Sequence, residues 1–286
     1  MATLDIRFTK MHGLGNDYLY IDARDMVGQD WPQLAQAMSD RHFGVGADGI
    51  ILIVPSDKAP VGMRIFNQDG SESEMCGNGL RAMAKWLFDR GQGGLEQAIE
   101  TGAGVLYPQV VEVKAQKAVR IRVDMGRPQW TRQALGITVG SAEDGFREQT
   151  IAVGEERVTA SAVSMGNPHL IVFGPLWDDS QLCRLGPRLE HHPWFSRRIN
   201  VHSVEVKTPE RLSMRHWERG AGPTLACGTG VAAAVALAYE DKKTGPRVQV
   251  TVPGGELVAE VAQDGRILLE GPAVEVFEGV YPWALD

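Results

Sequence analysis

Glu74-Met75-Cys76-Gly77-Asn78-Gly79 is the first of two related hexapeptides, and the second is Leu225-Ala226-Cys227-Gly228-Thr229-Gly230. Each hexapeptide runs into a stretch with helical character, and Cys227 follows Cys76 by 151 residues. The same offset relates Gly15-Asn16 to Gly166-Asn167, Met63-Arg64 to Met214-Arg215, and Phe66 to Trp217. This recurrence predicts two halves with the same fold, each presenting one thiol.

The length and composition are those of an ordinary soluble globular protein. A chain of 286 residues predicts about two domains, and 43% of its residues are hydrophobic and 23% charged. The net charge of −7 argues against a nucleic-acid partner, because such partners select basic surfaces. Residues 1–7 lack the apolar core of a signal peptide, and the longest apolar run, Val231–Tyr239, is too short to span a bilayer. We therefore expect a cytoplasmic protein with no membrane or nucleic-acid partner.

The three cysteines show no Cys-x-x-Cys spacing, so they predict neither a disulfide framework nor a metal site. His169 and His216 are conceivable zinc ligands, but a zinc site would need more ligands than the pattern offers. Cys183 has no Gly-x-Gly after it, and we expect it to be a small structural hydrophobe.

Patterns with a period of two predict half-buried strands at residues 110–114, 118–123 and 247–252, and turn signals lie at 69–71, 253–255 and 263–265. Short amphipathic helices are expected after Asp30 and after Ser180, and two more helices begin at the cysteine hexapeptides. The last of these, over residues 231–238, is apolar on all sides and should be buried.

The predicted fold class is therefore α+β, with two β-rich, pseudo-symmetric domains that each wrap around a central helix. The active site is expected in the cleft between them. The first domain should cover residues 1–127 and carry Cys76, and the C-terminal tail, residues 273–286, should return to it as a strand. The second should cover residues 128–272 and carry Cys227.

A cysteine that directly precedes Gly-x-Gly and a helix lies at a helix N-terminus, where unpaired N–H groups and the positive end of the dipole meet. We expect this position to lower the pKa of the thiol towards neutrality. The N–H groups of Gly77, Asn78, Gly228 and Thr229 would also bind an anion, for which a carboxylate is the natural candidate. Glycine would allow the backbone to approach that ligand closely.

Two such helix ends that share one carboxylate would place its α-carbon between the two sulfur atoms. One cysteine, as a thiolate, would remove the α-proton, and the other, as a thiol, would return a proton to the opposite face. The two dipoles would stabilise the negative charge that develops on the carboxylate. The alternatives are two tight turns with inert cysteines, or a redox pair of thiols.

Several segments of the chain resemble diaminopimelate epimerases in order and spacing, over essentially the whole length. The matching segments are residues 11–17 (MHGLGND), 66–71 (FNQDGS), 76–81 (CGNGLR), 165–169 (MGNPH), 198–201 (RINV), 217–222 (WERGAG) and 226–230 (ACGTG). The resemblance implies an epimerase that interconverts LL- and meso-diaminopimelate without a cofactor, in the synthesis of lysine and cell-wall precursors. It also implies the two-domain α+β fold and a homodimer.

The resemblance also implies roles for individual residues. Cys76 and Cys227 correspond to the two acid/base residues, and His169 and Glu218 to the residues that tune the thiols. The implied substrate-binding residues are Asn16, Asn67, Gly77, Asn78, Asn167, Asn200, Glu218, Arg219, Gly228 and Thr229. Arg219 suits a second carboxylate through its planar guanidinium, and Glu218 suits an ammonium group. No residue is implied to bind a metal.

Two rival functions share parts of this pattern. A proline or hydroxyproline racemase would use the same paired thiols, but its substrate has no distal amino-acid end for Glu218 and Arg219 to recognise. A thiol–disulfide redox protein would depend on cycling between oxidised and reduced cysteines, whereas epimerisation needs both thiols reduced.

Overall fold

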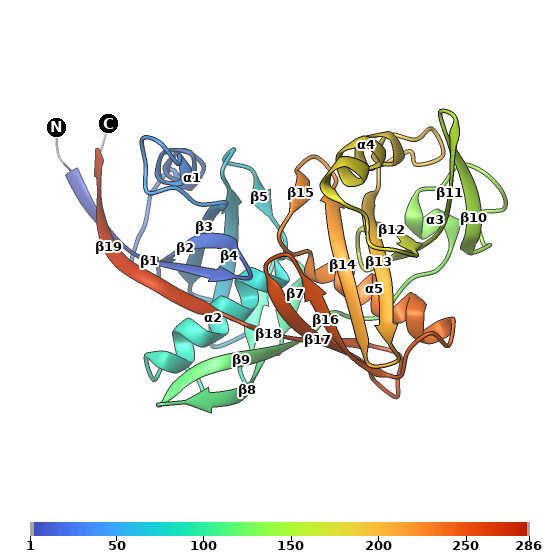
Figure 1. The fold of residues 1–286 in the computed structure, drawn as a ribbon. Helices are drawn as coiled ribbons and strands as arrows, with labels where there is room; N and C mark the ends of the chain where they lie inside the picture. The colour runs from blue at the N-terminus through green and yellow to red at the C-terminus, as the bar shows by residue number, and fades with distance from the viewer. Residues whose placement is uncertain (1–2, 285–286) are drawn as a thin grey trace. The chain divides into compact units, whose positions relative to one another are not determined.

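The computed structural model describes residues 3–284, which form two compact units. Unit 1 consists of residues 3–123 and 271–284, and unit 2 of residues 124–270. The expected domain ranges also included residues 1–2 and 285–286, which lie outside the described residues. Figure 1 shows the elements of each unit in the order of the sequence.

Unit 1 is built on a sheet with the strand order β19-β1-β2-β3-β4-β6-β7, and the short strand β5 pairs with β4. A hairpin of β8 and β9 completes the unit. The elements are β1 (Thr3–Gly13), β2 (Asn16–Asp22), α1 (Trp31–Ser39), β3 (Gly49–Val54), β4 (Val61–Asn67), β5 (Glu72–Ser73), α2 (Gly77–Asp89), β6 (Ile99–Thr101), β7 (Gly104–Leu106), β8 (Gln109–Lys114), β9 (Lys117–Asp124) and β19 (Val274–Ala284).

Unit 2 is built on a sheet with the strand order β10-β11-β12-β13-β14-β16-β17-β18, and β15 pairs with β14. Its elements are α3 (Arg132–Leu135), β10 (Phe146–Val153), β11 (Glu156–Ser164), β12 (Pro168–Phe173), α4 (Asp179–Glu190), β13 (Asn200–Thr208), β14 (Arg211–Glu218), β15 (Gly222–Thr224), α5 (Gly228–Glu240), β16 (Arg247–Val252), β17 (Gly255–Val261) and β18 (Ile267–Pro272).

The two sheets repeat one another strand by strand. In unit 1 the pairs β1–β2, β2–β3, β3–β4 and β4–β6 are antiparallel, parallel, antiparallel and parallel in turn. In unit 2 the pairs β11–β12, β12–β13, β13–β14 and β14–β16 follow the same sequence of directions. Helices α1 and α4 occupy equivalent crossovers, and so do α2 and α5. The prediction of two halves with one fold is confirmed.

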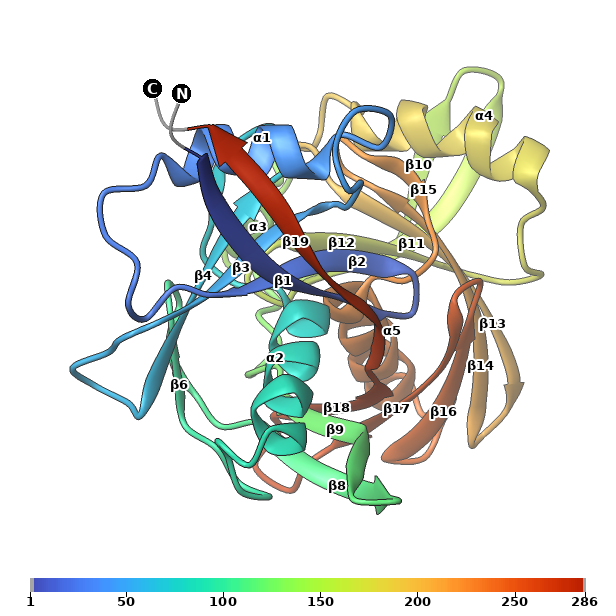
Figure 2. The ribbon, with the colours of Figure 1, turned by 90° about the vertical axis from the view of Figure 1, so that its left-hand side faces the viewer.

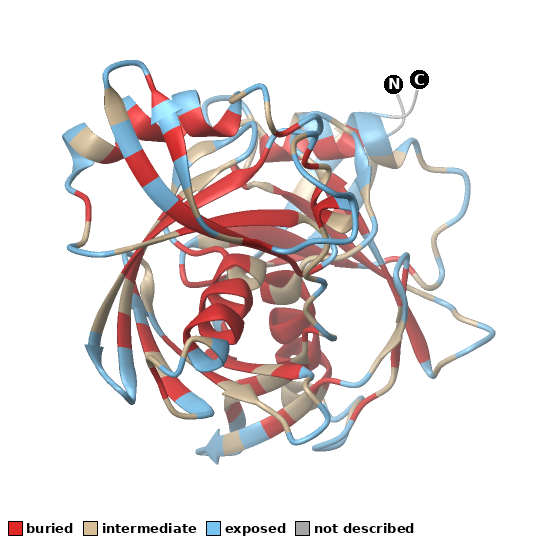
Figure 3. Cartoon of the chain, turned by 90° about the vertical axis from the view of Figure 1, so that its right-hand side faces the viewer, coloured by how far each residue is buried: buried red, intermediate tan, exposed pale blue. Residues whose placement is uncertain are grey.

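Each unit encloses one helix. In α5 every residue from Gly230 to Ala238 is buried, as its uniformly apolar sequence predicts. In α2 the buried residues run from Asn78 to Leu87, and this helix packs beneath β1, β2 and β19 (Figure 2). Figure 3 shows the two enclosed helices largely in the colour of buried residues. The predicted α+β class, with β-rich units around a central helix, is confirmed.

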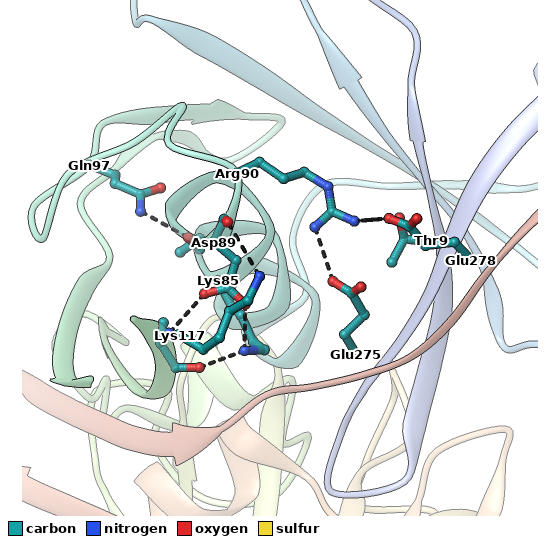
Figure 4. A network of polar contacts seen from close by, with 10 residues as sticks. Thr9, Lys85, Asp89, Arg90, Gln97, Lys117, Glu275 and Glu278 are labelled. Carbon is teal, nitrogen blue, oxygen red and sulfur yellow. Dashed lines mark hydrogen bonds and ion pairs between the residues drawn. The ribbon is translucent and has the colours of Figure 1, made fainter. Parts of the chain in front are cut away.

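The C-terminal tail forms β19, which pairs with β1 in antiparallel register from Thr3↔Ala284 to His12↔Val274. Arg90, which follows the last residue of α2, forms ion pairs with Glu275 and Glu278 of this strand (Figure 4). One turn earlier, Lys85 donates to the buried Asp89 at 2.7 Å. The Arg90 ion pairs hold the tail of the chain against the end of α2, and the Lys85–Asp89 pair stabilises the last turn of that helix.

Several local predictions can be compared directly with the structure. Helix α1 begins after Asp30, as predicted, and the Asp30 carboxylate accepts a hydrogen bond from the N–H of Gln33. Strands β8, β9 and β16 occupy the predicted strand positions. Helix α4 begins at Asp179, slightly before the expected start, because Asp178 and Gln181 form a reciprocal capping box.

The prediction for Cys183 is wrong. Cys183 is exposed, because the buried side of α4 consists of Leu182, Leu185 and Leu189, and position 183 lies off that face. Among residues 3–284, no helix is both long enough and apolar enough to cross a bilayer.

Candidate active site

The two cysteines occupy the same local position in their units. Cys76 precedes α2 with backbone angles φ −138° and ψ 115°, and Cys227 precedes α5 with φ −129° and ψ 102°. Each is therefore an extended N-cap residue in front of a 13-residue helix. The sulfur of Cys76 accepts a hydrogen bond from the N–H of Gly79 at 3.4 Å, whereas Cys227 makes no side-chain cap bond.

The first N–H groups of both helices have no acceptor within their own helix. They belong to Gly77 and Asn78 in α2, and to Gly228 and Thr229 in α5, as predicted from the sequence. Such groups, together with the positive end of the helix dipole, suit a carboxylate. Each unit thus has a helix end suited to an anion beside a thiol.

The second glycine of each motif is required by packing. A Cβ atom on Gly230 would lie 2.5 Å from the ring of the buried His202, and one on Gly79 would lie 2.6 Å from the end of Ile51. The close packing of Gly79 and Gly230 is thus a requirement in its own right, separate from the approach of a ligand. A rigid imidazole cannot yield in the way that an isoleucine methyl can, so Gly230 is the stricter requirement.

The thiol of Cys76 lies in a network of amides. Its Sγ atom donates to Asn16 Oδ1 at 3.5 Å, and Asn78 Nδ2 donates to the same oxygen at 3.2 Å. Asn16 Nδ2 donates to Asp48 Oδ2 at 2.7 Å, which fixes the orientation of the Asn16 amide. Arg81, fully buried, donates to Asn78 Oδ1 at 2.7 Å. Two of the sequence-predicted binding residues, Asn16 and Asn78, therefore meet at Cys76.

Asn67 lies at the end of β4, opposite Gly49 of β3. Its backbone N–H and its side-chain amide both donate to Ser71, at 2.8 Å and 3.0 Å, across the turn that leads to β5. Within residues 3–284, no recorded hydrogen bond connects Asn67 to the Cys76 network. In its own unit, Asn67 therefore acts as a turn residue.

The pKa of Cys76 differs from the expectation. Burial raises the pKa of this thiol, and the opposing effects of the Gly79 N–H, the Tyr18 hydroxyl and the charge of Arg81 are smaller. The predicted lowering towards neutrality is therefore wrong, because desolvation outweighs the helix end. The same contact raises the pKa of Tyr18, chiefly through the negative charge of a Cys76 thiolate and secondly through burial.

Cys227 in unit 2 has a different set of neighbours. Thr229 Oγ1 lies 3.7 Å from its sulfur atom, and Glu218 acts on it electrostatically. Thr224 holds the Glu218 carboxylate with a hydrogen bond of 2.6 Å. Burial, followed by the Glu218 charge, raises the pKa of Cys227 well above its ordinary value. The predicted lowering is wrong for this thiol too, and the placement of Glu218 beside it fits a tuning role.

His169 lies at the start of β12, fully buried. Its Nε2 atom lies 2.9 Å from Asn167 Oδ1, and its Nδ1 atom lies 2.9 Å from His202 Nε2. Burial lowers the pKa of His169 to about 3, with smaller contributions from the charges of His216 and Arg219. His169 is therefore neutral at physiological pH, and it lies in the same group of side chains as Cys227.

The side chain of Asn200 is hydrogen-bonded to the backbone of Arg219. Asn200 Oδ1 accepts the N–H of Arg219 at 2.9 Å, and Asn200 Nδ2 donates to the carbonyl of Pro168 at 2.9 Å. The guanidinium of Arg219 is exposed and donates to the carbonyl of Arg197 at 2.7 Å. Asn200 thus links the turn before His169 to the turn after Glu218.

Glu190 supports this turn, although the sequence analysis did not single it out. Its buried carboxylate accepts hydrogen bonds from the N–H of Gly220 at 3.0 Å and the indole of Trp217 at 2.8 Å, and it pairs with Arg198 at 3.2 Å. Two of these partners, Trp217 and Gly220, flank residues 218–219, so Glu190 holds this turn on both sides. A lone glutamate at the end of an amphipathic helix gives no signal of such a role, because most lie in solvent.

Other residues of the two groups also went unrecognised in the sequence. They are Tyr18, Asp48 and Arg81 around Cys76, and His202 beside Cys227. Tyr18 directly follows one resembling segment and Arg81 ends another, so their short distance in sequence from Asn16 and Cys76 was the available signal. His202 follows Asn200 by two positions on one strand, so the period of a strand places both side chains on one face.

A comparison with protein-family models matches residues 8–131 and 161–276 of the chain to the model described as "Diaminopimelate epimerase". Among curated proteins, the diaminopimelate epimerase of Pelotomaculum thermopropionicum is 44% identical over 281 residues, which cover 97% of this chain and 99% of that protein. The diaminopimelate epimerase of Heliobacterium modesticaldum is 41% identical over 97% of this chain and 100% of its own length.

Solved structures share the fold at low sequence identity. A PhzF-family phenazine biosynthesis protein of Bacillus anthracis matches with a TM-score of 0.68 and 18% identity, over 97% of this chain and 99% of that chain. A hydroxyproline epimerase of Agrobacterium vitis matches with a TM-score of 0.68 and 12% identity, over 99% and 92% of the two chains. At these identities the likeness concerns the fold alone.

Proposed function

The chain belongs to the diaminopimelate epimerase family, and from this membership we propose that it interconverts LL- and meso-diaminopimelate by moving a proton between two thiols and one α-carbon. It is an isomerase. The observation that carries the proposed mechanism is the repetition of one arrangement, an extended cysteine in front of a buried helix, in two units of identical strand order.

The proposed reaction uses each cysteine once in each turnover. One thiolate removes the α-proton, the electron pair left on the carbon is delocalised into the carboxylate, and the other thiol delivers its proton to the opposite face. The N–H groups of Gly77, Asn78, Gly228 and Thr229 are proposed to hold that carboxylate while its charge grows. Thiols and helix ends supply all the groups that this scheme needs, and we propose that the enzyme works without a cofactor or metal.

The two thiols differ in how readily they ionise. The thiolate of Cys76 is favoured by the Gly79 N–H, the Tyr18 hydroxyl and the positive charge of Arg81. The thiolate of Cys227 is opposed by the neighbouring carboxylate of Glu218. We therefore assign the more acidic thiol to Cys76, and the role of a protonated donor in the resting enzyme to Cys227.

The distal end of the substrate is assigned to polar side chains. We propose that the exposed guanidinium of Arg219 pairs with the second carboxylate, since its planar fork suits that group. Asn16, Asn67, Asn167 and Asn200 are proposed to fill the remaining hydrogen bonds. The contacts of Glu218 with Thr224 and Cys227 support a tuning role for Glu218, alongside His169, in addition to binding an ammonium group.

The experiment that tests this proposal compares the purified chain with its Cys76→Ala and Cys227→Ala variants on LL-, meso- and DD-diaminopimelate, without added cofactor. The wild type should interconvert the LL and meso forms, and each variant should lose this activity. A single variant that retains wild-type turnover would remove the two-base scheme. L-Proline and trans-4-hydroxyproline in the same assay test the racemase alternative, which the shared fold leaves open but which the sequence relatives do not favour.

We also propose a homodimer located in the cytoplasm, where its product would serve the synthesis of lysine and cell-wall precursors. Strand β19 is the edge strand of its sheet, and Val274, Val276, Phe277 and Val280 on it are exposed. An apolar edge strand is suited to a second copy of the chain. A reducing compartment suits an enzyme that needs two free thiols. Analytical ultracentrifugation of the wild type and of Val280→Lys tests the dimer, which this substitution should weaken.

A further inference from the structure

Three buried histidines form a series across neighbouring strands of unit 2. His169 lies on β12, His202 on β13 and His216 on β14, and each side chain is fully buried. His169 Nδ1 lies 2.9 Å from His202 Nε2, and His202 Nδ1 lies 2.9 Å from His216 Nδ1. Among the described residues, His216 Nε2 has no hydrogen-bond partner. The proposed reaction needs only His169 from this series.

The hydrogen positions along the series follow from its first member. Asn167 offers its carbonyl oxygen to His169 Nε2, so that nitrogen carries the hydrogen and Nδ1 of the neutral ring is a lone pair. His202 Nε2 must then donate to His169 Nδ1, and His216 Nδ1 must donate to His202 Nδ1. His216 Nε2 consequently carries a buried lone pair that accepts no hydrogen bond from the described residues.

Cys227 closes this arrangement at one end. Its sulfur atom, one ring nitrogen of His169 and one of His202 all lie within 4.8 Å of one another, and all three residues are buried. We propose that His169 Nδ1, His202 Nε2 and Cys227 Sγ bind a divalent cation of the zinc class, with a water molecule as fourth ligand. Two imidazoles and one thiolate are the ligands that zinc and cobalt(II) select over magnesium or calcium.

The geometry requires only a small adjustment. Zinc binds nitrogen at about 2.0–2.1 Å, so a tetrahedral site separates two nitrogens by roughly 3.3 Å. The facing nitrogens of His169 and His202 are 2.9 Å apart. A tetrahedral cation lies off the line that joins them, so it displaces the hydrogen that the two rings now share while each ring turns towards it and the two nitrogens move apart by a few tenths of an ångström.

The surroundings resemble those of established metal-binding histidines. Such a histidine usually donates its second N–H to a carbonyl or another acceptor, which fixes the ring. Asn167 Oδ1 is in place as the acceptor for His169, and His216 Nδ1 becomes the acceptor for His202 once its hydrogen has moved to His202 Nδ1. Gly230 backs the His202 ring so closely that a Cβ atom there would lie 2.5 Å from it, which prevents the ring from swinging away.

The protons balance in this step. The Cys227 thiol loses one proton to solvent as its sulfur becomes a metal-bound thiolate. The cation displaces the hydrogen from His202 Nε2, His202 Nδ1 takes the hydrogen of His216 Nδ1, and the displaced proton is accommodated on the lone pair of His216 Nε2. Net release is one proton for each cation bound. The unpartnered Nε2 atom of His216 thus serves as the acceptor of the proton that the cation displaces.

The consequence for catalysis rests on the proposed function. A Cys227 sulfur that is bound to a cation cannot deliver a proton to the substrate, so the cation acts as a reversible inhibitor. The binding itself needs no assumption about the substrate, which allows the two ideas to be tested separately.

Cobalt(II) titration of the reduced wild-type protein provides the test, because thiolate-to-cobalt charge transfer and tetrahedral ligand-field bands report the ligands directly. We expect both sets of bands at one cobalt per chain and their displacement by zinc. Cys227→Ser, which is nearly isosteric, should lose the charge-transfer band, and His202→Gln should weaken binding at least tenfold. Removal of the supporting ring in His216→Phe should weaken it about 10- to 100-fold.

The control variants are Cys183→Ser and His191→Gln, since Cys183 is an exposed thiol on α4 and His191 is an exposed histidine at the end of that helix. Both should bind cobalt as the wild type does, and circular dichroism of every variant checks that it is folded. Octahedral spectra, or charge-transfer bands that persist in Cys227→Ser, would overturn the proposal. Zinc should also inhibit epimerisation and a chelator should reverse it. Absence of epimerase activity alongside intact cobalt bands would contradict the proposed function and leave the metal site standing.

Discussion

The Oδ1 atom of Asn16 accepts a hydrogen bond from the thiol of Cys76 across 3.5 Å. The amide has this orientation because its Nδ2 atom donates to Asp48 at 2.7 Å. Asp48 therefore determines which end of the amide faces the sulfur, although it does not itself contact the thiol in the recorded hydrogen bonds. The amide that faces the Cys76 thiol is thus oriented by the Asp48 carboxylate.

We predict that Asp48→Ala lowers kcat/KM for diaminopimelate about tenfold, which corresponds to about 1.4 kcal/mol. The physical reason is that the Asn16 amide can then rotate and present its N–H groups to the sulfur. Steady-state kinetics measures the effect. Arg41→Ala is the matched control, because it removes the half-exposed ion pair with Asp48 and leaves the bond to Asn16 in place. A kcat/KM for Asp48→Ala within twofold of the control would contradict this role.

Tyr18 provides a second test of the Cys76 environment. Its hydroxyl opposes the rise in the pKa of Cys76, so Tyr18→Phe should raise that pKa further. In a Cys227→Ser background, the pH profile of Cys76 alkylation by iodoacetamide should move to higher pH. Tyr20→Phe removes the same atom two positions along β2, where the hydroxyl is bonded to the carbonyl of Gly79, and it should leave the profile in place. Identical profiles in both variants would exclude the Tyr18 contact.

A third prediction concerns the packing of Gly230 against His202. Gly230→Ala should lower the free energy of unfolding by about 1–3 kcal/mol, because the added methyl group overlaps a rigid, fully buried ring. Gly245→Ala serves as control, since a Cβ atom there would meet nothing closer than 3.9 Å. Denaturant unfolding measures both variants. Equal stability of the two would show that the His202 ring has room to move.

Glu190 should act on substrate binding through the turn that it holds. Glu190→Gln keeps the shape of the side chain but turns one acceptor towards Trp217, Gly220 or Arg198 into a donor. We expect KM for diaminopimelate to rise several-fold with a smaller change in kcat, because Arg219 lies in this turn and is the residue proposed to bind the distal carboxylate. Glu205→Gln on β13, a half-buried surface glutamate paired with Lys207, is the control. An unchanged KM in Glu190→Gln would mean that the turn is held without this carboxylate.

Much of the fold followed from the sequence for identifiable physical reasons. The apolar surface of residues 231–238 could only be buried, and the offset between the hexapeptides could only reflect a repeated topology. The start of α4 was misplaced because two acidic residues precede Ser180, and only the geometry of Asp178 shows which of them caps the helix. Cys183 was misjudged because one step around a helix separates the core face from solvent.

The chemistry around the thiols was less accessible from the sequence. A motif identifies a helix N-terminus, but the sign of a pKa shift depends on how much water the fold removes, and here burial dominates for both Cys76 and Cys227. The series from His169 to His216 arises from the pairing of three strands, including His202 directly opposite His216. The spacing of positions 169, 202 and 216 in the sequence does not indicate that these side chains meet.

The central claim is that two thiols act on opposite faces of one carbon, and incubation of LL-diaminopimelate with the enzyme in D₂O tests it most directly. At low conversion, mass spectrometry and NMR should find one deuterium at the inverted α-carbon of the meso product and none in the recovered LL substrate. This is expected because the thiol that removes the proton retains it, while the opposite thiol carries a solvent deuteron. Recovered substrate that acquires deuterium as fast as product forms, or product that retains the original hydrogen, would contradict the two-thiol account.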